Sequence, residues 1–416
     1  MLNIGAKIKE LRKERKMTLA QVAGDRLTKG MLSLIENGKA QPSMESLQYI
    51  ASQLEIDVAE LIQSEDNKQV RETFMQVEQL YSQFKKEFNK EQREIKGQEL
   101  LQLIQPLMQS GSLKGSNYEE VRLLELYLLV RYLLKIDRSI EPFLPLAKMY
   151  ENIHAYSKVL ECFTRLGGIK FGQHQLEQAL HYLLDAKKYI ERYNYLIGDF
   201  EKLDYYYNLT VIYAALNDDI KMEEYLNLAL NITKEKGVLY RFNDFYRLLF
   251  FINCSKGDAE KSKYYLNKLR LFMELFENPF DEILYSLTTL FYINRIEHDY
   301  LKALAVTIDN HRLPEDALNH AMVFINGEHA YAHWQLKQYG EAKKCLATLF
   351  VPEATIHPID LAIIYRSYAV RALCYYEEGD IENAKRDILY AMDGVKEFKD
   401  TLDKQFILQA YERIMQ

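Results

Sequence analysis

The chain has 416 residues, of which 48% are apolar and 27% charged, with 17 Gly and 8 Pro. This composition excludes a disordered, collagen-like or low-complexity chain, and at about 100–200 residues per domain the length predicts two or three structural units. The formal net charge of −7 is only mildly acidic, so any surface that attracts nucleic acid has to be local.

Two further features indicate the compartment. The four cysteines lie far apart and form no CxxC motif, which favours reduced cytosolic thiols. The start of the chain lacks the apolar stretch of a signal peptide, and the most apolar run, residues 123–134, is well short of the roughly 20 residues that cross a bilayer. We expect a cytoplasmic protein with no membrane segment.

The first 40 residues differ in charge from the rest of the chain. They contain nine Lys and Arg against four Asp and Glu, a local balance of +5, which leaves −12 for the remainder. The polar stretch 64–69 then precedes a long series of Leu- and Tyr-rich helical patterns, and its composition predicts a linker. We therefore predict a first domain over residues 1–66 and a second over residues 67–416.

Capping residues divide the first domain into short helices. One helix ends at the basic stretch 13–16, and Thr18 caps the helix that follows. After a turn, Thr28 caps a third helix over residues 29–36, which the Asn-Gly pair 37–38 ends. The spacing of two caps and a stop predicts three helices connected by tight turns.

These helices, with the segments 35–43 and 47–54, closely resemble the Cro/repressor-type helix-turn-helix family. The resemblance implies that the third helix lies in the major groove of DNA. Lys29 and Ser33 are then placed for base edges, while Asn37 at the far end of the helix contacts the phosphate backbone.

Few side chains of this helix can form hydrogen bonds to base edges. Positional matching places Gly30 and Leu34 at reading positions, and neither side chain forms hydrogen bonds, so DNA shape or dimer spacing has to supply part of the specificity. The alternative is a helical unit whose basic residues are ordinary solvated surface. The predicted DNA-binding residues are Thr18, Thr28, Lys29, Gly30, Ser33, Leu34, Asn37 and Lys39.

Beyond the linker, a pattern of paired helices repeats. The second helix of each pair opens with a mostly small residue, at successive intervals of 43, 40, 41, 39 and 42 residues. Small side chains at this place let the two helices of a pair approach closely. The residues are Ala179, Met222, Ser262, Ala303, Ala342 and Ala384.

This spacing resembles the tetratricopeptide family over about residues 155–400. The resemblance implies antiparallel helix pairs stacked into a right-handed superhelix, so that the whole chain is all-α, with the helix-turn-helix domain joined to the superhelix. The intervals exceed the family's usual length of about 34, so longer helices are expected. Residues 70–150 are helical by pattern but do not fit the repeat.

A tetratricopeptide superhelix exposes the first helix of every pair along a concave groove that suits a short peptide. An Asn clamps a peptide backbone there, aromatic residues supply pockets, and arginines receive a carboxylate. For any single arginine, pairing with an acidic residue of a neighbouring repeat is an equal alternative. The predicted peptide-binding residues are Asp204, Tyr207, Asn208, Arg247, Phe251, Tyr292, Arg295, Glu328, Tyr331, Trp334 and Arg366.

The two modules together resemble the peptide-responsive regulators of Gram-positive bacteria, including the PlcR, NprR, PrgX and Rgg families. This resemblance implies a quorum-sensing transcription regulator that binds double-stranded DNA, forms a homodimer, and is controlled by a short signalling oligopeptide in the groove. A rival interpretation follows from the Rap proteins, which share the repeat domain: a module that binds and inhibits a signalling protein such as a phosphorelay response regulator.

The sequence offers little for catalysis. His329 and His333 stand four residues apart beside Glu328, but the order is not HExxH and both positions pack inside a repeat, so we expect no metal site. Gly-rich phosphate loops, GxSxG and dinucleotide fingerprints do not occur in the sequence. We therefore expect no cofactor and no enzymatic activity.

Overall fold

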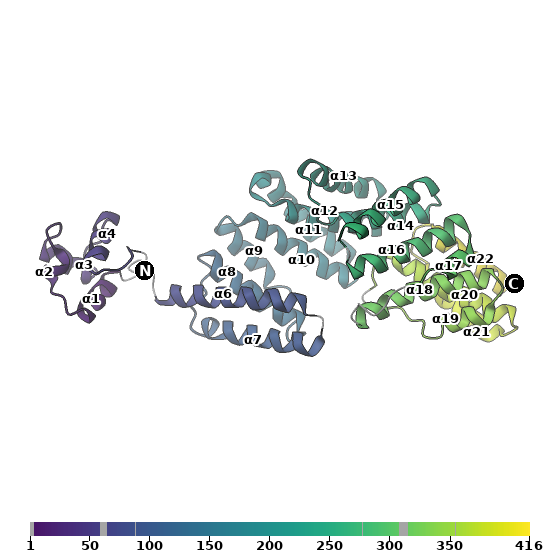
Figure 1. Ribbon diagram of the computed structural model, residues 1–416, viewed down its shortest axis with the longest axis horizontal. Helices are drawn as coiled ribbons and strands as arrows, with labels where there is room; N and C mark the ends of the chain where they lie inside the picture. Colours follow the sequence, from purple (N-terminus) through teal and green to yellow (C-terminus); the bar gives the residue numbers. More distant parts are fainter. Residues whose placement is uncertain (1–3, 59–64, 88, 277, 308–314, 354) are drawn as a thin grey trace. The chain divides into compact units, whose positions relative to one another are not determined.

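A computed structural model describes residues 4–58, 65–87, 89–276, 278–307, 315–353 and 355–416. Every regular element in these ranges is a helix, which confirms the all-α fold (Figure 1). Contacts between residues divide the chain into two compact units, Met1–Pro142 and Phe143–Gln416. Within the described residues, no helix is both long and apolar enough to cross a bilayer.

The first unit begins with four short helices. They are α1 (Ile4–Glu14), α2 (Leu19–Ala23), α3 (Lys29–Glu36) and α4 (Met44–Gln53). One apolar side chain or more from each helix is buried in a common core, which includes Ile8, Val22, Leu32, Ile35 and Ile50. The predicted caps are present, because the Thr18 and Thr28 hydroxyls accept backbone N–H bonds at the starts of α2 and α3.

Three longer helices complete the first unit: α6 (Glu65–Lys86), α7 (Lys90–Gln109) and α8 (Tyr118–Leu133). Their core includes Phe84, Leu100 and Leu126. From Glu65 onward the polar stretch predicted as a linker is helical, because a polar sequence can begin a helix as readily as it can form a loop. The domain boundary near residue 66 stays a prediction, because residues 59–64 lie outside the described residues.

The second unit is an array of helix pairs, which Figure 1 shows following one another along the chain. A leading helix α9 (Phe143–Asn152) packs on α10. The pairs are α10 (Tyr156–Gly172) with α11 (Leu176–Tyr193), α12 (Asp199–Ala215) with α13 (Asp219–Lys236), α14 (Phe242–Ser255) with α15 (Ala259–Phe276), α16 (Pro279–Tyr292) with α17 (Tyr300–Leu304), α18 (Glu315–Gln335) with α19 (Tyr339–Cys345), and α20 (Pro358–Glu377) with α21 (Ile381–Val395).

The repeat register is confirmed residue by residue. Each of the six residues used to align the repeats is the fourth residue of the second helix in its pair, and each is buried. The small first-helix residue Gly167 shows why size matters, because a Cβ there would lie 2.9 Å from Cγ of Leu183 on α11. Small residues at these places therefore set the distance between paired helices.

Two features of the array depart from the regular repeat. The fourth pair is irregular, because α16 continues into a π-helical turn, Ile293–Glu297, and α17 has only five residues. A further helix, α22 (Leu402–Met415), follows the last pair and packs on α20 and α21. The repeat pattern did not predict α22, although Thr401 caps it by accepting a bond from the Lys404 amide at 3.3 Å.

The contact between α1 and α3 generates a prediction about Gly5. A Cβ added at Gly5 would overlap the backbone carbonyl of Ile35, which cannot move without breaking α3. We expect Gly5→Ala to unfold the four-helix core, seen as rapid protease cleavage within residues 4–58 by mass spectrometry. Gly30→Ala is the matched control, because the nearest atom to its new Cβ is Thr28 Oγ1 at 4.0 Å. Equal protease resistance of the two variants would contradict this packing.

Candidate DNA-binding and ligand-binding sites

The outer face of α3 is free of contacts with the core. Lys29, Gly30 and Leu34 are exposed and Ser33 is half-buried, whereas Leu32 and Ile35 on the opposite face are buried. The Thr28 hydroxyl accepts the Met31 amide at 3.1 Å and so fixes the start of the helix. Residues predicted to read DNA therefore share one accessible face.

Polar side chains at the start of α2 and the end of α3 already form hydrogen bonds within the protein. Thr18 forms a reciprocal capping box with Gln21, whose Oε1 accepts the Thr18 amide at 2.8 Å. The Asn37 side chain donates to the Ser33 carbonyl at 2.7 Å and accepts from Lys9 Nζ at 3.0 Å. An Asn37 contact with phosphate would have to replace these bonds, whereas Lys39 remains exposed.

The basic residue Arg12 of the first domain is held in an ion pair between two helices. Arg12 forms a bidentate pair with Glu36, with Nε–Oε1 and Nη2–Oε2 distances of 2.6 and 2.8 Å, and its Nη1 donates to the Met17 carbonyl at 3.0 Å. The hydrogen bond to Glu36 raises the pKa of Arg12. This pair joins α1 to α3 and positions the exposed face of α3, a role that residue counting did not reveal.

In the second unit, three of the predicted peptide-binding residues come together. Tyr207 of α12 and Arg247 and Phe251 of α14 line one pocket of about 180 Å³. Val211 and Leu248 of the same two helices also line it. The other walls come from places that the repeat pattern did not indicate: Phe171 at the end of α10, His320 on α18, and residues 355–357, 359 and 360 around the start of α20. No sequence signal places the connection before α20 against helices more than a hundred residues earlier.

Asp204 and Asn208 line a second, more open pocket of about 320 Å³, next to Glu161 and Arg165 of α10. Asp204 accepts a bond from Arg241 Nε at 2.7 Å, so its charge is largely neutralised within the array. The Asn208 amide donates to the Asp204 carbonyl of its own helix at 2.8 Å. One N–H of Asn208 is therefore engaged within its own helix, and the predicted role of Asn208 and Asp204 in peptide binding stays a prediction.

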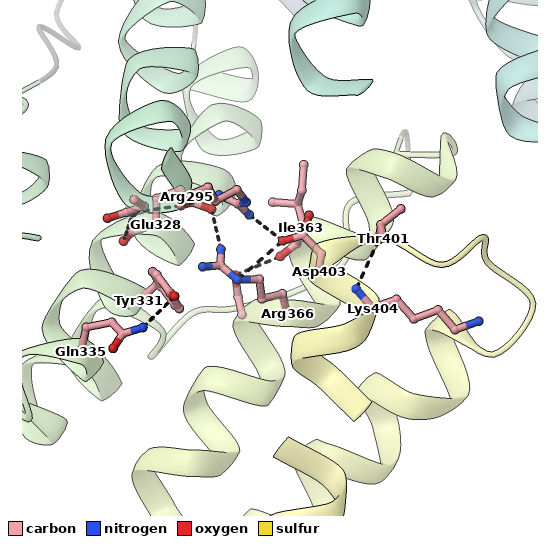
Figure 2. Close-up of polar contacts among 11 residues, drawn as sticks. Arg295, Glu328, Tyr331, Gln335, Ile363, Arg366, Thr401, Asp403 and Lys404 are labelled. Carbon is pink, nitrogen blue, oxygen red and sulfur yellow. Dashed lines mark hydrogen bonds and ion pairs between the residues drawn. The ribbon is translucent and has the colours of Figure 1, made fainter. Parts of the chain in front are cut away.

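The other charged residues predicted for the groove form a buried ionic cluster (Figure 2). Arg295 contacts Glu328 at 2.8 Å and Asp403 at 2.7 Å, and Arg366 contacts Glu328 at 3.0 Å. All four side chains are at most 6% exposed. This is the pairing with neighbouring repeats that the sequence left open, so Arg295, Glu328 and Arg366 direct their charges at one another and at Asp403.

Aromatic rings cover the cluster. The Arg366 guanidinium lies 3.7 Å from the Tyr331 ring centroid and Arg295 lies 3.9 Å from that of Phe291. Trp334 packs edge-on against Phe406 of α22, with centroids 5.5 Å apart, and Tyr292 is buried in the core. Burial alone lowers the pKa of Arg295, but Asp403 and Glu328 outweigh it and the net shift is upward. These residues stabilise the array and do not line the pocket.

The structure also bears on the histidines of α18. His329 is substantially buried, and this burial lowers its pKa. His333 Nδ1 lies 2.6 Å from Oε1 of Gln338. Among the described residues, no group of three His, Cys, Asp or Glu side chains is arranged to hold a metal ion.

Comparison with known proteins gives one family match, to the helix-turn-helix family over residues 8–61. The chain therefore contains an N-terminal helix-turn-helix domain, to which helices α1–α4 belong. No curated protein sequence matches the chain.

Six chains of solved structures are similar to this chain, among them PlcR, ComR and PrgX. PlcR of Bacillus thuringiensis in complex with the peptide PapR7 and DNA is 18% identical, with a TM-score of 0.37, over 74% of this chain and 100% of PlcR. The apo form of the competence regulator ComR from Streptococcus vestibularis is 14% identical, with a TM-score of 0.21, over 99% and 98%. A point mutant of PrgX is 11% identical, with a TM-score of 0.20, over 90% and 95%. Because every TM-score is below 0.5, the proposals below rest on this chain's own residues.

The ionic cluster generates a prediction about Glu328. Glu328→Gln leaves two buried arginines with one carboxylate, which typically costs about 3–5 kcal/mol. We expect a lower urea midpoint for unfolding of the second unit, followed by the fluorescence of Trp334, the chain's single tryptophan. Glu341→Gln, which removes an exposed partner of Lys344, is the control and should leave the midpoint unchanged. Equal midpoints for both variants would show that the cluster does not hold the array together.

Proposed function

We propose that the protein is a cytoplasmic transcription regulator that binds double-stranded DNA and is controlled by a short signalling peptide bound in its helix-pair array. The observation that carries the DNA-binding part is the helix-turn-helix domain with its capped third helix and one free face. A helix N-terminus with exposed amides and a neighbouring Lys suits a phosphate backbone and a base edge.

Binding as a homodimer is part of the proposal because one α3 offers few hydrogen bonds to bases. With Gly30 and Leu34 at reading positions, one α3 supplies few hydrogen bonds to bases. A dimer doubles these contacts and adds half-site spacing, about 34 Å or a multiple, as a source of specificity. The peptide part of the proposal is supported by the pocket at Tyr207, Arg247 and Phe251, which combines aromatic walls with a cation.

A binding selection tests the proposal. Purified full-length protein is mixed with random-sequence duplex DNA at fixed moderate salt, with and without a cytosolic peptide extract, because phosphate contacts make affinity depend on salt. An enriched palindrome whose recovery changes with the extract supports a peptide-controlled regulator. Failure to enrich any sequence in either condition rejects DNA recognition and favours the rival, a Rap-like module that binds a signalling protein.

The same assay gives a prediction for α3. Lys29→Ala removes the side chain best placed for a base edge, a contact usually worth about 1–3 kcal/mol, so affinity for the selected sequence should fall about tenfold or more. The control is Lys221→Ala, an equal loss of charge on α13 in the second unit, which should leave affinity unchanged. Both are measured by fluorescence anisotropy at several salt concentrations. Identical affinities for the two variants would remove α3 from the DNA interface.

A further inference from the structure

The pocket of about 180 Å³ joins parts of the chain that are far apart in sequence. Helices α10, α12 and α14 form one side, and residues 355–357 of the connection before α20, the first turn of α20 and His320 of α18 form the other. The connection is held against α10, since the ring centroids of His357 and Phe171 are 6.5 Å apart. A ligand in this pocket therefore contacts the first three helix pairs and the last two together.

Thr355 and His357, just before α20, bring two polar side chains into the pocket. Thr355 is 5% and His357 is 9% exposed, and both line the pocket. Thr355 Oγ1 makes no hydrogen bond, and His357 Nε2 reaches no acceptor at normal hydrogen-bond geometry, although the Val211 carbonyl lies close enough to raise the pKa of the ring. His357 Nδ1 accepts the Ile359 amide at 3.2 Å, so the neutral ring carries its proton on Nε2 and that nitrogen is a donor. Burial lowers the pKa of His357, which keeps the ring neutral, while Asp360, Arg247 and the Val211 carbonyl have smaller effects.

A buried hydroxyl without a partner, such as Thr355 Oγ1, is rare and costs about 1–3 kcal/mol, so its presence in a pocket points to a ligand that forms a hydrogen bond with it. The long contacts of Arg247 also indicate a ligand that accepts hydrogen bonds. Its guanidinium reaches Tyr207 Oη only at 3.5 Å and Asp244 only at 3.9 Å, whereas Arg295 in the ionic cluster has two carboxylate contacts below 3 Å. Asp360, which lines the same pocket, also raises the pKa of Arg247 through its charge, but no ion pair within 4.0 Å joins the two side chains in the described residues, so Arg247 keeps N–H donors for a ligand carboxylate.

We propose that this pocket binds a carboxylate of the signalling peptide, between Arg247, Thr355 and His357, with the attached apolar part held by Phe251 and its apolar neighbours. The proposal deepens the proposed function and rests on it. The carboxylate comes from the peptide's C-terminus or from an Asp or Glu side chain. Asp360 also lines the pocket, and its negative charge opposes this ligand, so the attraction of Arg247 has to exceed that repulsion.

The first experiment identifies the group that binds. Full-length protein is incubated with random-sequence short peptides in two matched libraries, one with a free C-terminal acid and one with a C-terminal amide, and bound peptides are identified by mass spectrometry. Enrichment from the acid library alone supports a terminal carboxylate. Enrichment from both libraries with Asp or Glu at a fixed position supports a side-chain carboxylate.

Two other outcomes separate the failure of this inference from that of the proposed function. Enriched peptides that need no carboxylate overturn the inference and leave the peptide-controlled regulator standing. No enrichment from either library overturns both.

Variants then test the residues with an enriched peptide, by isothermal titration. Arg247→Gln should weaken binding about tenfold to a hundredfold, and the control Arg270→Gln, on the exposed face of α15, should not change it. Thr355→Val removes a hydroxyl that the empty pocket leaves unpaired, so it should weaken binding about twofold to tenfold without lowering the thermal unfolding temperature. A purely structural role for Thr355 predicts the reverse.

The sign of the effect at Asp360 distinguishes the two possible charges of the ligand. Asp360→Asn removes the repulsion and should tighten binding of a carboxylate peptide. Weaker binding by Asp360→Asn, with unchanged binding by Arg247→Gln, would mean that the pocket takes an ammonium group, and the proposal would be wrong.

Discussion

The second unit depends on a set of four charges that have to be satisfied together. Arg295 extends from the π-helical turn after α16, Glu328 from α18, Arg366 from α20 and Asp403 from the first turn of α22. Taking such charges out of water is expensive, and mutual pairing offsets that cost only when every partner is in place. The cluster therefore permits few arrangements of these four helices. Because α20 begins at Pro358, the same constraint fixes the connection that forms one wall of the pocket.

Local patterns in the sequence were sufficient for the helices. The register of small residues holds even where Met222 and Ser262 replace Ala, because close approach of paired helices is decided within each repeat. The caps at Thr18 and Thr28 were predictable for the same reason, since a cap involves residues three apart. The α22 helix was not, because it follows the last repeat and has no counterpart in the periodicity.

Partners across the array could not be read from the sequence. Arg247 and Arg295 were both predicted for the groove, yet Arg295 pairs with Asp403, 108 residues away, while Arg247 has only long contacts. The repeat register gives the face of a helix on which a side chain lies, but the acidic residue opposite depends on how distant pairs meet. The positions of Thr355 and His357 were even less predictable, because they lie in an irregular connection that has no repeat register.

The pocket gives a physical reason why a ligand would change the array. Arg247, Thr355 and His357 lie around one pocket only while the residues before α20 pack against α10, α12 and α14. An arrangement that separates these parts of the chain would lose the contacts of all three residues with one ligand. A ligand shifts an equilibrium only by its differential affinity for the two states, and this geometry supplies such a difference. Couplings of about 1–3 kcal/mol are typical for regulated binding, about the value of one or two charged hydrogen bonds. Contacts at Arg247 and the connection are therefore enough to couple ligand binding to the arrangement of the helix pairs.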